Sequence, residues 1–205
     1  MSSPPRPPAP TGSAPRGADL LKGLADALPA SAKGRGLPPV DKWNPDHCGA
    51  IDMRIAADGS WHYLGTPIGR PAMARLFSTI LRREPDGEYV LVTPVEKVGI
   101  TVEDAPFLAV LLRLEGEGAD RRLVFTTNMG DETVAGPDHP LRATTDGRGE
   151  PALYVHVRGG LEARLNRPVY YQLVDLGGER VIGGRRVFGV ESAGRFFELG
   201  PVEWS

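Results

Sequence analysis

The aromatic residues of this 205-residue chain are confined to one part of it, which limits where a folded core can form. All 14 of them lie after position 42, whereas residues 1–42 contain 9 of the 20 prolines. A stretch rich in Pro, Ser, Ala and Gly cannot bury enough apolar surface to offset the entropy lost on ordering. We therefore expect the fold to begin near Trp43 and residues 1–18 to form a disordered tail.

Residues 19–42 complete this leader, and we expect a short helix followed by a linker there. Leucines recur at the spacing of one helical face, at Leu20, Leu21, Leu24 and Leu28. Such a helix could pack on the body or dock into a groove of a partner. A third interpretation is a signal peptide ending at Ala32, which Lys22 and Asp26 oppose because they interrupt the apolar stretch.

Charge divides along the same boundary. Residues 1–42 carry a net charge of +3 and the other residues carry −5, which together give −2. The body therefore lacks the basic surplus typical of nucleic-acid binding. No apolar run approaches the roughly 18 residues that a membrane span needs. The single cysteine, Cys48, excludes an internal disulfide and fits a reducing compartment. We expect a cytoplasmic protein without a membrane contact.

The body begins with signals for a hairpin and a helix. Apolar and charged residues alternate over 50–56, and Asp58-Gly59 then predicts a tight turn into a return strand over 60–64. Pro71 suits the first turn of a helix, and the apolar stripe after it predicts a helix over 71–83.

A similar succession returns later in the chain. Gly-Arg-Pro at 69–71 precedes the first predicted helix, and Asn-Arg-Pro at 166–168 precedes a second one over 168–176. The two stretches could be alike by chance, or residues 50–107 and 152–199 could be copies of one strand-turn-helix-strand unit. Two like units would pack together and leave a groove at their junction.

These patterns predict an α+β fold with two small domains, residues 43–107 and 108–205. Residues 128–149 are polar and punctuated by Gly and Pro, so we expect mostly loop there. The chain should close with a hairpin of strands over 181–191 and 195–199.

No catalytic or metal-binding motif is present. His47 and Cys48 are adjacent, and adjacent residues of an extended chain point in opposite directions. Neither a Cys-x-x-Cys nor a His-x-x-x-His pair supports them. A Gly-x-Ser-x-Gly nucleophile motif and a phosphate loop ending in Lys-Ser/Thr are also absent. We expect neither a metal nor a cofactor.

The predicted groove between the domains is our candidate binding site. Trp61 and Tyr63 share one face of the return strand, and rings beside arginines are typical of surfaces that anchor a protein or stack on bases. The two rings could instead simply cover the helix. Charged residues would fix the register of the partner. The residues predicted to line the groove are Trp61, Tyr63, Arg70, Lys97, Glu103 and Asp104.

The leading prediction is a non-enzymatic binding or regulatory module with a protein partner, or alternatively a nucleic-acid partner. The competing hypothesis is an enzyme that acts on a small polar substrate with carboxylates of Glu103-Asp104 or of the loop Asn128–Glu132. A deep pocket with strongly shifted carboxylate pKa values would favour the enzyme, and an open aromatic groove would favour binding.

Three stretches of the chain resemble one bacterial family. They are Trp43-Asn44-Pro45 with Cys48–Met53, Asp58–Trp61 with Gly65–Pro71 and Arg75–Phe77, and Val92–Lys97 with Val102–Phe107. Through them, residues 43–200 resemble the domain-of-unknown-function family 1285, which has no assigned activity. The resemblance implies two α+β domains from a repeated motif, the second loosely similar to a pleckstrin-homology barrel. It also implies a binding role at the domain interface, with signalling as one setting.

Overall fold

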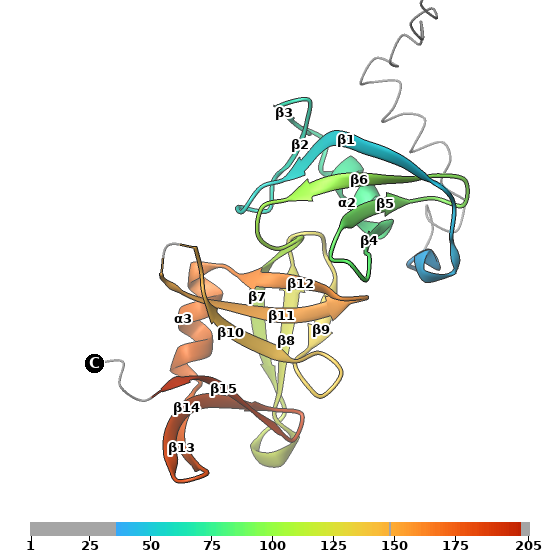
Figure 1. Cartoon of the computed structure of the whole chain (residues 1–205). Coiled ribbons are helices and arrows are strands. Elements are labelled where there is room, and N and C mark those ends of the chain that lie inside the picture. The colour runs from blue at the N-terminus through green and yellow to red at the C-terminus, as the bar shows by residue number, and fades with distance from the viewer. Residues whose placement is uncertain (1–35, 148, 202–205) are drawn as a thin grey trace, which may run out of the picture.

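The computed structural model describes residues 36–147 and 149–201. The predicted tail over 1–18 and the predicted leucine helix lie outside these residues. The described chain opens with a single turn of 3-10 helix, η2 (Val40–Lys42), and then enters the first of two domains (Figure 1).

The first domain is a curled six-stranded sheet with one helix packed against it (Figure 1). Its strands are β1 (His47–Ile55), β2 (Trp61–Tyr63), β3 (Thr66–Pro67), β4 (Leu81–Arg83), β5 (Tyr89–Val92) and β6 (Lys97–Val102). They lie in the order β3-β2-β1-β6-β5-β4, and only the central pair, β1 and β6, is parallel. Helix α2 (Pro71–Thr79) connects β3 to β4.

The predicted hairpin forms because Asp58-Gly59 suits its turn. Gly59 adopts a φ of +79°, which few other residues tolerate, and the Asp58 carboxylate accepts hydrogen bonds from the backbone N–H and hydroxyl of Ser60. Trp61 and Tyr63 then pair with Ile55 and Met53, so all four side chains share the buried face of the sheet.

Helix α2 starts at Pro71 as predicted, but the prediction that it continues to Arg83 is wrong. It ends at Thr79, and the chain enters β4 two residues later. The hydroxyls of Ser78 and Thr79 donate to the carbonyl oxygens of Arg75 and Leu76 at 2.8 and 2.7 Å. Such side-chain bonds compete with continuation of the helix.

The second domain contains a six-stranded and a three-stranded sheet. The first has the order β10-β11-β12-β7-β8-β9, and β13, β14 and β15 form the second. Helix α3 (Arg167–Asp175) packs on β7, and η3 (Gly118–Asp120) lies between β7 and β8. The strands are β7 (Phe107–Glu115), β8 (Arg122–Thr127), β9 (Glu132–Val134), β10 (Leu141–Thr145), β11 (Pro151–Arg158), β12 (Leu161–Leu165), β13 (Gly178–Ile182), β14 (Arg185–Ser192) and β15 (Arg195–Pro201).

The predicted α+β class is therefore wrong: the protein is mostly β. Strands make up 50% of the structure and helices 14%, because α2 and α3 are only nine residues each. The second domain also divides into two sheets, with α3 between β12 and β13. The segment 128–149 lies mostly outside strands, as expected, but it also contributes two short strands that were not predicted, β9 and β10.

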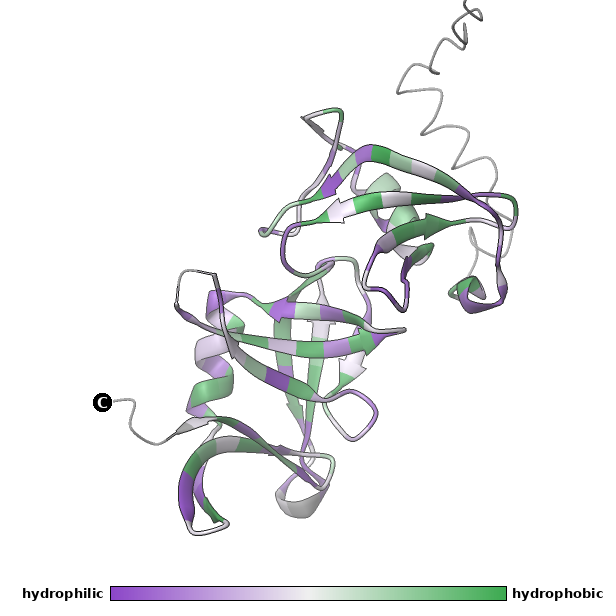
Figure 2. Cartoon of the chain, in the orientation of Figure 1, coloured by the Kyte–Doolittle hydropathy of each residue, from purple (hydrophilic) through white to green (hydrophobic). Residues whose placement is uncertain are grey.

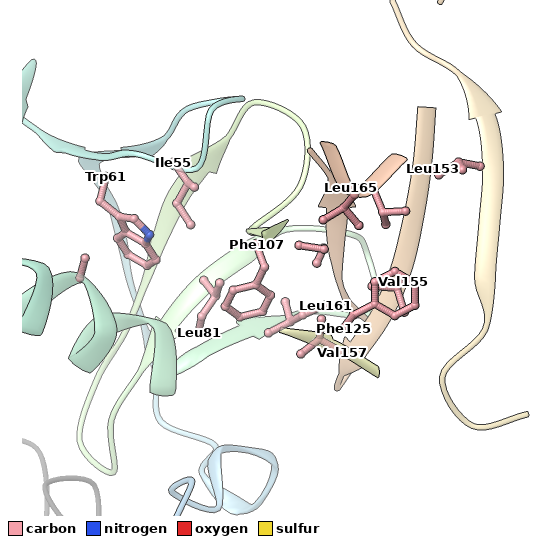
Figure 3. Close-up of a cluster of buried hydrophobic side chains, with 14 of the residues drawn as sticks. Ile55, Trp61, Leu81, Phe107, Phe125, Leu153, Val155, Val157, Leu161 and Leu165 are labelled. Carbon is pink, nitrogen blue, oxygen red and sulfur yellow. The ribbon is translucent and has the colours of Figure 1, made fainter. Parts of the chain in front are cut away.

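Buried apolar side chains of both domains form one continuous cluster. Strand β12 contributes its apolar face to this cluster: apolar residues, which are buried, alternate along it with half-buried polar residues (Figure 2). Trp61 and Leu81 of the first domain and Phe107 and Leu161 of the second belong to the same cluster (Figure 3). The domains are thus joined by a shared core, and the junction between them is packed. Among the described residues, neither helix has the length and apolar character needed to cross a bilayer.

Candidate functional site

The two aromatic residues predicted to line a groove are buried. Trp61 is 3% exposed and stacks on Phe77 of α2 with ring centroids 6.4 Å apart, and Tyr63 is 9% exposed. Burial raises the pKa of the Tyr63 phenol, with a smaller contribution from Asp52. The Trp61 ring therefore packs against the helix, which is the alternative that the sequence left open.

The four charged residues of the predicted site do not form one surface. Arg70 is exposed and occupies the N-cap position of α2, where its side chain makes no capping hydrogen bond. Lys97 begins β6, whereas Glu103 and Asp104 follow its end, so Lys97 and Glu103 are six residue steps, or about 20 Å, apart along the strand. The structure therefore does not bring the six predicted residues together.

Lys97 supports the segment that leads into the first domain. Its ammonium lies 3.3 Å from Glu84, whose other oxygen accepts from Arg82 at 2.6 Å. Arg82 in turn donates to the carbonyl oxygens of Val40 and Trp43 at 2.9 and 2.7 Å. Burial opposes ionisation of Glu84, yet Arg82 and Lys97 keep its pKa below the ordinary value. This network fixes residues 40–43 against β4.

Asp104 links the two domains. One of its oxygens accepts from the Tyr154 hydroxyl of β11 and the other from Arg164 of β12, both at 2.7 Å. Arg164 also donates to Asp146 at 3.0 Å. Burial and the bond to Asp104 raise the pKa of Tyr154 to about 12. The phenol is therefore a hydrogen-bond donor at neutral pH.

Arg158, at the end of β11, is a junction residue that the sequence did not indicate. Its guanidinium donates through Nη2 to the carbonyl oxygen of Ser78 in α2 at 2.8 Å and lies 4.8 Å from the Phe107 ring centre. Its Nη1 is 2.7 Å from Asp131. An arginine after a strand is usually solvated, so only the folded chain shows its partners.

Asn128 forms a third link across the junction. Its side-chain amide donates to the carbonyl oxygen of Gly59 at 3.2 Å and accepts from the backbone N–H of Leu108 at 3.0 Å. The turn between β1 and β2 thus rests on the loop after β8. Asn128 belongs to the loop predicted as a candidate catalytic segment, and in the structure its side chain makes this positioning contact.

The carboxylates of the competing enzyme hypothesis are all bound by arginines. Glu103 pairs with Arg54, Asp104 with Arg164, Asp131 with Arg158, and Glu132 with Arg113. The backbone N–H of Ala57, together with Arg54, lowers the pKa of Glu103, and Arg113 lowers that of Glu132. The lowered pKa values keep Glu103 and Glu132 ionised, whereas a general acid needs a raised pKa. Among the described residues, no cluster of His, Cys, Asp or Glu could hold a metal ion.

A small pocket opens where the domains meet. It holds about 210 Å³, and we call it the junction pocket. Three segments line it: the entering chain, the end of α2 with β4, and the turn between β11 and β12. Its lining residues are Leu37, Pro38, Val40, Asp41, Thr79, Leu81, Arg82, Arg158, Gly159 and Leu161.

The fold and this junction define a mostly β, two-domain protein with a shared core. The chain belongs to the DUF1285 family: the family's N-terminal domain, a domain of unknown function, matches residues 38–105, and its C-terminal domain matches 106–199. This confirms the family resemblance seen in the sequence.

Two crystal structures of DUF1285 family proteins are similar to this chain. The protein from Silicibacter pomeroyi DSS-3 is 52% identical with a TM-score of 0.81, over 89% of this chain and 96% of its own. The protein from Shewanella baltica OS155 is 36% identical with a TM-score of 0.47, over 60% of this chain and 90% of its own. No curated protein matches the sequence.

Proposed function

We propose that this protein is a non-enzymatic binding module that holds a protein partner at the junction pocket. The observation that carries the proposal is a small, largely apolar pocket that three separate segments build at a packed domain boundary. The proposed site lies between the domains, where the sequence analysis also expected a site, but different residues line it.

The size and chemistry of the pocket suit one anchoring side chain. A volume of about 210 Å³ is below the 300–1,000 Å³ typical of small-molecule sites. Interfaces commonly gain most of their affinity from a few apolar or aromatic anchors buried in such pockets and surrounded by polar groups. Leu81 and Leu161 form the floor here, and both are 1% exposed.

The rim of the pocket adds an apolar contact and charges of both signs. Leu37, which is 52% exposed, lines the pocket together with the charged residues Asp41, Arg82 and Arg158. Mixed charge favours a protein segment over a nucleic-acid backbone, which would need uncompensated cations. The contacts of Arg82 and Arg158 described above hold these walls in place before a partner binds, which reduces the entropy lost on binding.

Substitution at the rim tests the proposal. A partner captured by the full chain should bind Leu37→Glu at least tenfold more weakly, because the charge meets an apolar contact. Val95→Glu is the matched control, since Val95 is 72% exposed in the turn between β5 and β6. Both positions are exposed, so both variants should keep the wild-type melting temperature.

The proposal is wrong if Leu37→Glu and Val95→Glu bind the captured partner with equal affinity. Nucleic acid is the competing outcome. It would show as an affinity that falls steeply with salt and is insensitive to Leu37→Glu.

A further inference from the structure

A second cavity lies in the C-terminal domain, between α3 and the strands β11 and β12. It holds about 570 Å³, more than the junction pocket, and shares no lining residue with it. Its floor includes Leu153 and Leu165, which are 4% and 5% exposed. This volume falls within the range of sites that enclose a small molecule.

Aromatic rings extend the apolar lining to the mouth of the cavity. Tyr170 and Tyr171 of α3 meet edge to face with ring centroids 5.6 Å apart. Tyr171 is 60% exposed, and burial of Tyr170 raises the pKa of its phenol. Rings at a cavity mouth can close over an apolar ligand and bury its surface.

The two arginines that line the cavity differ in whether their charge is compensated by neighbouring carboxylates. Arg164 donates from one Nη to Asp104 and from the other to Asp146, so its charge is compensated. Arg167 is exposed at the first residue of α3, and no hydrogen bond or ion pair joins it to the residues around it in the described chain. The positive end of the helix dipole adds to its charge. Arg167 is therefore the cation that this cavity offers to a ligand.

We propose that this cavity binds a small amphipathic acid, which places an apolar or aromatic body between α3 and the sheet and one anionic group at Arg167. A carboxylate or sulfonate would gain a charge-assisted hydrogen bond from the guanidinium. Glu150, which also lines the cavity, disfavours a second negative charge. This site does not depend on the junction pocket or on a protein partner.

The aromatic sulfonate 1-anilinonaphthalene-8-sulfonate is a suitable fluorescent probe, with dodecanoate as competitor. The full chain should bind one probe molecule, and dodecanoate should displace it. Arg167→Gln should weaken probe binding about tenfold through loss of the charged bond. Arg185→Gln removes another exposed arginine, on β14, and should leave binding unchanged.

Filling the cavity tests its location separately. Val174→Phe adds bulk to a half-buried wall residue and should abolish binding, while Tyr171→Ala, at an exposed position, should weaken it. Thermal melts identify any variant that fails to fold. Binding that is equal in Arg167→Gln and Arg185→Gln would overturn the role of Arg167. Binding unchanged in both a folded Val174→Phe and Tyr171→Ala would overturn the site itself.

Discussion

The guanidinium of Arg158 donates to the carbonyl oxygen of Ser78 at 2.8 Å, and this bond joins the two domains. Ser78 lies in the last turn of α2, where the backbone carbonyls carry partial negative charge; the N–H of the C-cap residue Ile80 is also directed at the Ser78 oxygen. A cation from the second domain thus satisfies the helix end of the first. Together with the ion pair to Asp131, it fixes how the domains meet and where the junction pocket forms.

Replacing Arg158 should destabilise the whole chain. Arg158→Met keeps much of the apolar stem but leaves Asp131 and the Ser78 carbonyl without their cation, at a cost of about 2 kcal/mol. For a chain of this length that corresponds to a fall of about 4–8 °C in Tm. Calorimetry should show it, with Arg185→Met as the control. Equal melting temperatures for the two variants would mean that the junction does not depend on Arg158.

The contact between Gly59 and Asn128 should make Gly59 unusually intolerant of substitution. Gly59 and Gly65 have similar positive φ angles, +79° and +73°. A Cβ at Gly59 would lie 2.7 Å from the Asn128 amide, whereas a Cβ at Gly65 would meet nothing within 4 Å. Both alanine variants incur about 1–2 kcal/mol of backbone strain, and Gly59→Ala should lose about 1–2 kcal/mol more from overpacking.

Urea unfolding of the two glycine variants measures this difference. Adding Asn128→Ala should reduce the extra cost at position 59 and leave that at 65 unchanged, because it removes the crowded amide. If Gly59→Ala and Gly65→Ala are equally stable, the turn between β1 and β2 does not rest on the second domain.

Trp61 should matter for folding rather than for direct contact with a partner. Trp61→Ala removes a large ring from the shared core and should cost about 3–5 kcal/mol. Trp61→Phe keeps an aromatic ring against Phe77. The substitution breaks no hydrogen bond, because Nε1 of Trp61 has no partner among the described residues. We expect Trp61→Phe to fold and to bind the captured partner with wild-type affinity. If Trp61→Phe folds but no longer binds the partner, the Trp61 ring contacts the partner and this prediction is wrong.

The hairpin and helix starts could be predicted because their signals are local. Asp58-Gly59 and Pro71 specify their turn and helix start whatever surrounds them. Strand β10 could not be predicted, since four of its five residues are exposed and only pairing with β11 defines it. The end of α2 was ambiguous because Ile80 and Leu81 suit the apolar stripe of a helix as well as a buried strand.

The site was harder to predict than the fold because it depends on which charges meet. The sequence around Trp61 does not distinguish an exposed ring from one that is buried against Phe77, as it is in the structure. Arg158 meets Ser78 eighty residues away, and no local pattern identifies that partner. Asp104 was predicted to face a partner, and its two oxygens instead hold Tyr154 and Arg164.

Because of the hydrogen bond from Tyr154 to Asp104, the free energy of unfolding should fall at alkaline pH. The Tyr154 pKa of about 12 in the folded chain exceeds its ordinary value of 10.0, so the protonated phenol stabilises the fold fully below pH 10. That contribution is lost as the pH rises through 12. The free energy of unfolding of the wild type should therefore fall between pH 10 and 12, and that of Tyr154→Phe should fall less.

Chemical unfolding across this pH range provides the measurement, with Tyr171→Phe as the control for loss of an exposed phenol. Tyr154→Phe should also be less stable than the wild type at pH 7, since Asp104 loses a donor. If the free energy of unfolding depended on pH in the same way for the wild type and Tyr154→Phe, the raised pKa of Tyr154 would be contradicted.

Site-specific photo-crosslinking of the captured partner tests the binding account most directly. A benzophenone amino acid would replace Asp41, on the rim of the junction pocket, or Val95, in the exposed turn between β5 and β6. We predict a crosslink from position 41, reduced when Leu37→Glu is added, and none from position 95. A crosslink from position 95 with none from position 41 would contradict partner binding at the junction pocket.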